Sequence, residues 1–444
     1  MTSVADHFDV VVVGRSLAGL ACAALLAKRH LRVRIVKAAP DLELSSEPLF
    51  GLKSAPIVSR VLDELGLLHT VRTRLAAQLL PIEVVLPDRR FSLPPRGAAQ
   101  RETLLRTFPD CAADLPPFLD RLEGYGGGLD EILDGDLDLP LTSFLRRRAL
   151  RAVSGSSPLT ALTGHRIPLP NAVPLERLSA ALLALAGQRP VSPSAIDIRG
   201  ARALWHLLHG LSRFTGGPDA LSRVIEEKFV GYGGVLDNRR VAAELRVSGS
   251  RIDAVLSDDG RVYTTDVAVL AVSDRLAHRL LPTLGPTPPP ALRQWSLETH
   301  EGRKRSGLPA LGNSTLSGLV AWAPEDLGSG VRLFGRGADL FAERAVGQSL
   351  PPPPPALSSD GEPLWVPTGD DRGRPAEGAY LAPAAPFGLF RPLPPGAPQN
   401  LLRVGSAMMP GLSLESDLGT AWHIARDAAR LVRHGPWLRS SGWR

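Results

Sequence analysis

The turn at residues 14–19 is the part of the sequence whose residue types and spacing best suit a chemical task. A dinucleotide-binding turn carries glycine at its first, third and sixth positions, for the tight turn, for close approach to a pyrophosphate and for helix–strand packing. Here the first and sixth positions are glycine and the third is Ser16. Free amides of the following helix can hold a pyrophosphate, and the Ser16 hydroxyl could donate to it. The predicted contacts are Gly14, Arg15, Ser16, Leu17, Ala18 and Gly19.

A second cofactor position follows at the usual distance beyond Gly19, at the end of the next apolar run. In dinucleotide-binding folds an Asp or Glu at this place accepts hydrogen bonds from the adenosine ribose. The residue here is Lys37, which has donors but no acceptor. Three interpretations stay open. Ribose recognition is weakened or lost, or Lys37 meets a phosphate as in a site for NADP, or Lys37 is a lysine at a strand end with no ligand.

These residues need a strand, a helix and a second strand to position them. The β-branched run at residues 9–13, ended by Gly14, predicts a buried parallel strand. Residues 17–30 are small and apolar with cations in the last turn, which predicts a helix. Residues 31–37 alternate as a strand does. Together they predict a βαβ unit with the glycine turn at its first corner.

The rest of the chain shows weaker patterns, which predict further helices, strands and one turn. Residues 258–260, Asp-Asp-Gly, predict a hairpin turn. Residues 284–395 are rich in Pro and Gly and show few periodic segments. The remaining predictions are helices at 100–133, 172–187, 201–211 and 417–434, and strands at 240–245, 251–256, 265–272 and 401–405.

Composition excludes several classes of protein. Of 444 residues only two are cysteine, which is too few for a disulfide framework and fits a cytoplasmic protein. The net charge of +6 is spread along the chain and aromatic residues are 5%, so we expect no nucleic-acid partner. The sequence contains no run of 18 apolar residues, so we expect no membrane-spanning helix. The basic tail from Arg426 to Arg444 could touch anionic lipid, so we keep a peripheral contact with the inner face of the membrane as a possibility.

Three blocks in the correct order give a resemblance to a known family. The first is Val10–Val36, the second runs from Gly216-Gly217-Pro218 through Gly233, Val235 and Val241 to the strand at 266–272, and the third is Arg403–Ser406 with Pro410–Glu415 and Gly419. The chain thereby resembles the phytoene desaturase-like branch of the FAD-dependent amine oxidase and carotenoid desaturase superfamily. The further cofactor contacts that this resemblance implies are Val241, Gly405, Ser406, Gly411, Leu412 and Ser413.

The resemblance implies an α/β fold with two domains. A discontinuous Rossmann-like FAD/NAD(P)-binding domain would comprise residues 1–75, 212–282 and 396–444, and a second, α+β substrate domain would comprise residues 76–211 and 283–395. The implied activity is that of an FAD-dependent oxidoreductase, of desaturase, saturase or isomerase type. It would transfer hydride between flavin and an apolar, isoprenoid- or carotenoid-like small molecule. The start of the last helix would face the flavin pyrimidine.

The chain departs from the family pattern at several cofactor positions. Besides Ser16 and Lys37, Ser406 stands where the family has an aspartate, and the family's GG-R turn is missing between Pro40 and Gly51. Each lost charged hydrogen bond could cost about 1.5–3 kcal/mol. The alternative hypothesis is therefore a non-catalytic relative with weakened or lost FAD binding, serving as a binding or assembly module.

No catalytic residue is predicted, and no metal site. His206 and His209 lie three residues apart on a predicted helix beside Trp205, but no third ligand accompanies them. We interpret the pair as lining a pocket or packing at the helix surface.

Overall fold

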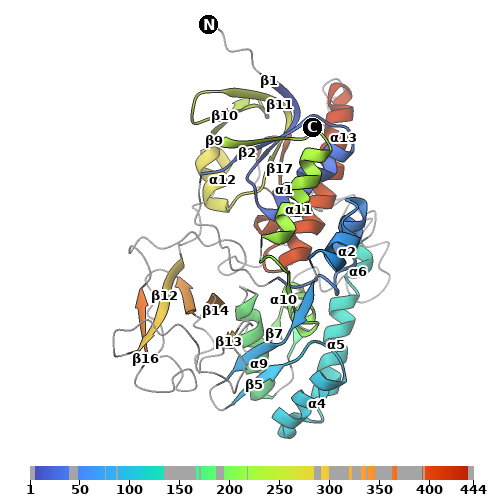
Figure 1. The fold of residues 1–444 in the computed structure, drawn as a ribbon, viewed down its shortest axis with the longest axis vertical. Helices are drawn as coiled ribbons and strands as arrows, with labels where there is room; N and C mark the ends of the chain where they lie inside the picture. The colour runs from blue at the N-terminus through green and yellow to red at the C-terminus, as the bar shows by residue number, and fades with distance from the viewer. Residues whose placement is uncertain are drawn as a thin grey trace.

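A computed structural model gives the fold (Figure 1). It describes residues 6–39, 49–75, 77–86, 89–134, 167–169, 172–186, 195–217, 219–284, 292–299, 320–322, 332–336, 339–345, 363–367, 393 and 396–438. Most of the segment in which the GG-R turn was found missing, residues 40–48, lies outside the described residues.

A parallel sheet forms the centre of the upper lobe in Figure 1. Its strands are, in spatial order, β9 (Val235–Ser248), β2 (Val33–Lys37), β1 (Asp6–Val13), β11 (Val262–Leu270) and β17 (Leu401–Arg403). Residues Val10 to Val13 are completely buried, which explains their uninterrupted apolar run, because a parallel sheet is covered on both faces. Three distant chain segments thus build one Rossmann-like sheet, and the predicted α/β class is confirmed. The exact domain boundaries stay a prediction.

Helix α1 (Leu17–Lys28) lies against one face of this sheet, with α11 (Ala220–Gly231) and α13 (Thr420–Leu438) beside it (Figure 1). Every residue of α1 from Ala18 to Ala27 is buried. A helix that is apolar on all sides must be enclosed, and its alanines and glycine let the sheet and the two helices approach from different sides.

The other face of the sheet is covered by a meander and a short helix. The first residues of β9 pair with β2, and its later residues turn away to pair with β10 (Arg251–Ser257), which returns to β11. Gly260 has φ of +80° in the predicted turn between β10 and β11, so the hairpin is confirmed. Helix α12 (Asp274–Leu280) completes this side.

The lower lobe is mainly helical. The predicted single helical stretch at 100–133 is instead α4 (Ala98–Thr107), α5 (Leu115–Gly127) and α6 (Asp130–Leu133), because Pro109 follows α4 and a run of glycines ends α5. The other helices are α2 (Pro56–Glu64), α3 (Leu68–Thr73), α9 (Val173–Leu185) and α10 (Ile198–Leu208). Small sheets pair β3 (Gln78–Leu80) with β8 (Leu211–Arg213), β6 (Ile167–Pro168) with β7 (Ala195–Ile196), and β4 (Ile82–Val85) with β5 (Arg90–Leu93) and β13 (Val320–Trp322).

A four-stranded antiparallel sheet lies within the stretch for which the sequence showed few periodic segments. Its order is β14 (Arg332–Arg336), β15 (Asp339–Ala345), β12 (Leu292–Thr299) and β16 (Pro363–Pro367). Trp295 pairs with Pro367, far along the chain. Strands whose pairing partners are distant in the sequence depend on tertiary context, so their hydrophobic pattern did not predict them.

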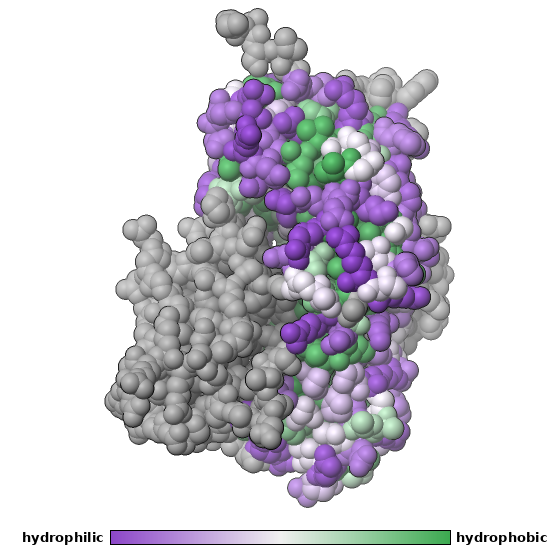
Figure 2. All heavy atoms as spheres, viewed as in Figure 1, coloured by the Kyte–Doolittle hydropathy of each residue, from purple (hydrophilic) through white to green (hydrophobic). Residues whose placement is uncertain are grey.

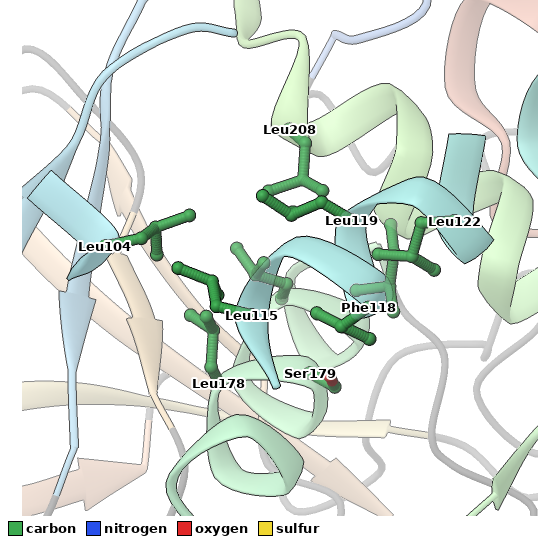
Figure 3. Close-up of a pocket in the computed structure, with 10 residues that line it drawn as sticks. Leu104, Leu115, Phe118, Leu119, Leu122, Leu178, Ser179 and Leu208 are labelled. Carbon is green, nitrogen blue, oxygen red and sulfur yellow. The ribbon is translucent and has the colours of Figure 1, made fainter. Parts of the chain in front are cut away.

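The helices of the lower lobe enclose a small apolar cavity between α4, α5, α9 and α10 (Figure 3). Leucines and Phe118 line it, with Ser179 the one polar residue among them. Its volume is about 10 Å³, which is the room of a single water molecule. The cavity is therefore a packing void rather than space for an organic substrate.

The described part of the chain contains no helix that is both long and apolar enough to cross a membrane. On the face seen in Figure 2, the described surface is mostly hydrophilic and its apolar areas are small and separate. In the basic tail, Arg430 pairs with Asp427 and the Arg426 guanidinium lies over the Trp422 ring, while residues 439–444 lie outside the described part. Peripheral membrane contact stays a prediction.

Two glycines of α5 provide a test of the packing between α5 and α10. An added Cβ on Gly126 would lie 2.4 Å from Cγ of Trp205, whereas one on Gly124 would meet nothing within 4 Å. We expect Gly126→Ala to lower the free energy of unfolding by about 1–3 kcal/mol through overpacking. Gly124→Ala should leave it unchanged or raise it by up to about 1 kcal/mol, through helix propensity. Urea unfolding measures both, and equal effects would contradict this packing.

Candidate functional site

The carboxyl ends of the parallel strands define the candidate site. Because β1, β2, β11 and β17 run in the same direction, the residues that follow them meet at one edge of the sheet. At this edge lie Gly14 and Ala271 directly after β1 and β11, Lys37 at the end of β2, and Gly405 two residues beyond β17. Ligands of open α/β sheets bind outside this edge, so the topology alone brings the first and third sequence blocks together.

The glycine turn fits the close packing expected of a cofactor turn. Gly14 has φ of +106°, and an added Cβ would lie 2.4 Å from the carbonyl oxygen of Ala271. A Cβ added to Gly19 would lie 2.6 Å from the carbonyl oxygen of Gly14. Both positions therefore require glycine, and α1 begins directly above the end of β11.

The side chains of the turn are already engaged within the protein. Ser16 is the N-cap of α1: its Oγ accepts from the Gly19 amide at 3.3 Å and donates to the Ala271 carbonyl at 3.2 Å. In this structure the hydroxyl therefore donates to Ala271, and the phosphate contact expected from the sequence stays a prediction. Arg15 Nε donates to Glu226 of α11 at 2.6 Å. What remains for an anion is the backbone at the start of α1, where no acidic residue offsets the positive end of the helix.

The C-terminal block closes against this turn. Gly405 has φ of +81°, and an added Cβ would lie 3.0 Å from Cβ of Ala18 and 3.2 Å from a carboxylate oxygen of Asp417. The Gly405 amide donates to Oγ1 of Thr420 at 2.7 Å. The opening turn and the closing helix are thus in direct contact.

The turn after Gly405 leads into the last helix through two residues with positive φ, Gly411 at +77° and Ser413 at +49°. Ser413 is one of two non-glycine residues with positive φ in the described part, and its Oγ accepts from the Phe50 amide at 3.2 Å. Leu412 between them is fully buried and belongs to the core. A π-helical turn (η6, Glu415–Gly419) precedes α13, and such turns are frequent at functional sites.

Exposure separates the predicted contact residues into two groups. Gly14, Ala18, Gly19, Gly405 and Leu412 are buried and shape the site from within. Those that keep access to solvent are Arg15, Ser16, Leu17, Lys37, Val241, Ser406, Gly411 and Ser413. The second group comes from four separate chain segments, and we call it the cofactor seam.

Lys37 ends β2 beside Val241 of β9, across an irregularity in which residues 238–240 bulge out of the register. Lys37 is half-buried and has no hydrogen-bond or ion-pair partner within the described part of the chain. The bulge is anchored by Asp237, which accepts hydrogen bonds from Arg34 at 2.6 Å, from Tyr263 at 3.0 Å and from Arg240 at 2.9 Å. Although burial opposes its charge, these bonds hold the pKa of Asp237 well below its ordinary value. This carboxylate serves the fold and does not replace the missing ribose acceptor.

Sequence reasoning missed a buried ionic cluster between the lobes. Arg202 of α10 is completely buried and donates through Nε to Glu415 Oε2 at 2.9 Å, and its Nη2 bonds the second Glu415 oxygen and Asp130. Its Nη1 bonds the Gly126 carbonyl. Glu415 belongs to the C-terminal block, so this cluster ties the helical lobe to the floor of the cofactor seam.

The same cluster contains a hydrogen-bonded chain of Ser54, His206 and Glu415. His206 Nε2 lies 2.8 Å from Glu415 Oε2, and Nδ1 lies 2.7 Å from Ser54 Oγ. Burial lowers the pKa of His206 to about 4. Burial opposes the charge of Glu415, but Arg202 and then His206 lower its pKa to about 2. An ionised carboxylate only accepts, so Nε2 carries the proton of the neutral ring and Nδ1 accepts from Ser54.

This order of groups is that of a nucleophile, a base and an acid. However, His206 and Glu415 are completely buried and Arg202 occupies the carboxylate, so the chain of bonds is closed to a substrate. We assign it a structural role. The sequence feature that could have revealed it is the pair Arg202 and His206, one turn apart on one face of a helix whose other residues are largely apolar.

His206 therefore does not pack at the helix surface, as the sequence interpretation allowed. His209 does lie nearer the surface: its ring packs edge-on against Trp205 with centroids 4.2 Å apart, and its Nδ1 lies 2.7 Å from the Trp205 carbonyl. The two histidines have separate partners and form no metal pair.

Comparison with known proteins yields structural likenesses alone: no family model and no curated protein matches the chain. Among solved structures, it is similar to an oxidoreductase from Methanosarcina mazei (12% identity, TM-score 0.48, covering 94% of this chain and 99% of that one). It is also similar to PqsL, a probable FAD-dependent monooxygenase from Pseudomonas aeruginosa (15% identity, TM-score 0.43, covering 98% of this chain and 89% of that one). A third similar structure is glycine oxidase from Bacillus cereus (12% identity, TM-score 0.42, covering 96% of this chain and 97% of that one). At such identities and scores, these likenesses carry no argument about the activity of this chain.

The buried pair of Arg202 and Glu415 should be important for stability. We expect Arg202→Met to lower the free energy of unfolding by about 3–5 kcal/mol, because Glu415 is left charged and buried. Arg246→Met provides the control, since the Arg246–Asp253 pair is exposed and contributes at most about 1 kcal/mol. Urea unfolding compares the two, and equal losses would show that Glu415 does not depend on Arg202.

His206 should make stability depend on pH. In the unfolded chain it binds a proton below pH 6.5, whereas in the folded chain it does so only below about pH 4. The free energy of unfolding should therefore fall as pH decreases between these values, by about 3 kcal/mol from this residue. His206→Gln, whose amide is neutral throughout this pH range, should flatten this part of the profile, and His69→Gln on exposed α3 should not. An unchanged slope in His206→Gln would refute the neutral buried ring.

Proposed function

We propose that the protein is an FAD-dependent oxidoreductase of desaturase, saturase or isomerase type. One observation carries the proposal: three distant chain segments, β1, β11 and β17, meet at the carboxyl edge of the sheet beside the cofactor seam, with Gly405 closing against Ala18. Such an edge, with the start of a buried helix above it, suits a dinucleotide pyrophosphate.

The residues present fit most of an FAD molecule. The amides at the start of α1 would hold the pyrophosphate, since Gly14 and Gly19 bring the backbone close and no acidic side chain lies in the first turn. Arg15 lies at the mouth of the turn, held by Glu226. Ser406 and Gly411 retain access on the opposite side, where the ribityl chain would run. Lys37 is the exception, because it offers the ribose no acceptor.

The closing helix would orient the reactive part of the cofactor. Its first turn follows Ser413, whose left-handed backbone directs the amides that come after it. The positive end of this helix would favour negative charge on the flavin pyrimidine, although Glu415 and Asp417 in its first turn offset part of that effect. When bound, the flavin would accept or donate hydride. The chain's own task is then to orient the substrate and to exclude water.

For the substrate we propose an apolar, isoprenoid- or carotenoid-like small molecule. Its support is the order of the three blocks that resemble the phytoene desaturase-like branch. The leucine-lined void in Figure 3 is too small for such a molecule, so the substrate would have to lie elsewhere, facing the seam.

Lys37→Glu tests the cofactor assignment. Purified protein should carry flavin absorption, and FAD should be released on denaturation. Lys37→Glu restores a ribose acceptor and should tighten FAD binding by about 10-fold or more, which corresponds to the 1.5–3 kcal/mol of a charged hydrogen bond. Lys228→Glu is the control: it makes the same charge change at another half-buried lysine, on α11, and should not change FAD binding. FAD titration of the flavin-free protein measures both.

Colourless protein that FAD fails to stabilise against heat in the parent and in Lys37→Glu would overturn the oxidoreductase proposal. The alternative, a non-catalytic relative acting as a binding or assembly module, would then stand. Measured turnover with bound flavin would exclude that alternative.

A second cofactor, NADP, is favoured by one specific observation. Lys37 lies half-buried at the adenosine end of the seam with no partner among the described residues. A 2′-phosphate would supply one. The same two variants separate the cofactors, because Lys37→Glu should weaken NADP binding and tighten FAD binding. Unchanged NADP affinity in Lys37→Glu would end this second proposal.

A further inference from the structure

The opposite edge of the central sheet carries a second group of chemically able side chains. His7 and Asp9 are two residues apart on β1, and Thr264 and Asp266 are two residues apart on β11. Alternate residues of a strand share a face, and the parallel register sets His7 directly beside Thr264. All four therefore project from one face at the amino ends of two adjacent strands.

Three of these side chains bring possible metal-ligand atoms close together. His7, Asp9 and Asp266 each offer one nitrogen or oxygen, and these atoms all lie within 4.8 Å of one another. His7 Nε2 lies 3.8 Å from Asp266 Oδ2. That separation is too long for a hydrogen bond, but two atoms each ~2.1 Å from one cation lie ~3–4 Å apart.

The other nitrogen of His7 is oriented as in metal-binding histidines. His7 Nδ1 lies 3.3 Å from Oγ1 of Thr264, so Nε2 is turned toward the carboxylates. A metal-ligating histidine almost always has such a partner on its second nitrogen, which fixes the direction of the ring. This contact sets the direction of the ring independently of the two carboxylates.

The backbone that carries these groups is held firmly. The Arg32 amide donates to Asp9 Oδ2 at 2.7 Å, and the Asp266 carbonyl accepts from Asn400 at 2.7 Å and from Arg251 at 3.3 Å. Between them Phe8 packs edge-on against Tyr263 with ring centroids 6.4 Å apart. The three possible metal ligands thus lie on paired strands and not on a loop. A bound cation would therefore have to order little of the backbone around it.

We propose that His7, Asp9 and Asp266 bind a divalent transition-metal cation of the Zn²⁺ class. One imidazole and two carboxylates provide the mixed nitrogen and oxygen set that such ions take, with water filling the remaining positions. The cation joins the start of β1 to β11. It lies toward the amino end of β1 (Asp6–Val13), and Asp9 is five residues before Gly14, about 17 Å at roughly 3.3 Å per residue, so the site is separate from the cofactor seam and independent of the proposed oxidoreductase activity.

Zinc uptake tests the site directly. Protein purified without a histidine tag and stripped with EDTA is dialysed against Zn²⁺, and bound metal is counted by elemental analysis. One equivalent per chain is expected, with His7→Ala weakening the affinity at least about 10-fold and Thr264→Val weakening it less. His69→Ala removes an exposed histidine elsewhere and should keep the parent affinity.

Thermal unfolding provides the second measurement. Zn²⁺ should raise the unfolding midpoint of the parent and of His69→Ala but not that of His7→Ala. In EDTA all three should unfold alike, because the His7 side chain is 48% exposed, and all three should hold equal FAD. No uptake by the parent, or equal affinity in parent and His7→Ala, overturns the proposal. Displacement of Zn²⁺ by equimolar Mg²⁺ would overturn the assigned metal class, since Mg²⁺ prefers oxygen ligands alone.

Discussion

The absence of a Cβ atom at three positions is the constraint on which this structure depends. At Gly14 and Gly19 an added Cβ would fall 2.4–2.6 Å from a backbone carbonyl oxygen, and at Gly405 it would fall 3.0 Å from Ala18. Because these contacts are so close, α1 begins directly over the end of β11 and the C-terminal block closes against α1. Larger residues would push the segments apart and open the edge of the sheet where three chain segments now meet.

A second constraint joins the helical lobe to that edge. Arg202 on α10 and Glu415 in the C-terminal block are both completely buried. Removal of either side chain would leave the other charge buried without a counter-charge, which is strongly destabilising. Asp130 and the Gly126 carbonyl take up the remaining donors of the guanidinium. The position of the lobe over the cofactor seam is thus fixed by directional bonds as well as by apolar packing. Such bonds specify one arrangement, which apolar contacts alone do less well.

How much of this was predictable differs between elements. The βαβ unit was predictable because its evidence is local: a β-branched run, a glycine corner and an apolar helix. The antiparallel sheet built on β12 was not, since Trp295 meets Pro367 across a long separation. In the site, the glycine turn and Lys37 could be placed from spacing. The ionic cluster could not, because nothing local relates Asp130, Arg202 and Glu415, and only the fold brings them together.

The departures from the family pattern fall on side chains, while the backbone of the site is retained. The Ser16 hydroxyl is taken up by the protein itself, and Asp237, near Lys37, is held by Arg34 and Tyr263. The anion cradle at the start of α1 depends on amides and the helix dipole, and neither changes with these substitutions. Recognition of the adenosine ribose depends on one side chain, and there the charge is reversed. In the proposed cofactor site, cofactor selection would therefore rest on the end of β2, and pyrophosphate binding would rest on the start of α1.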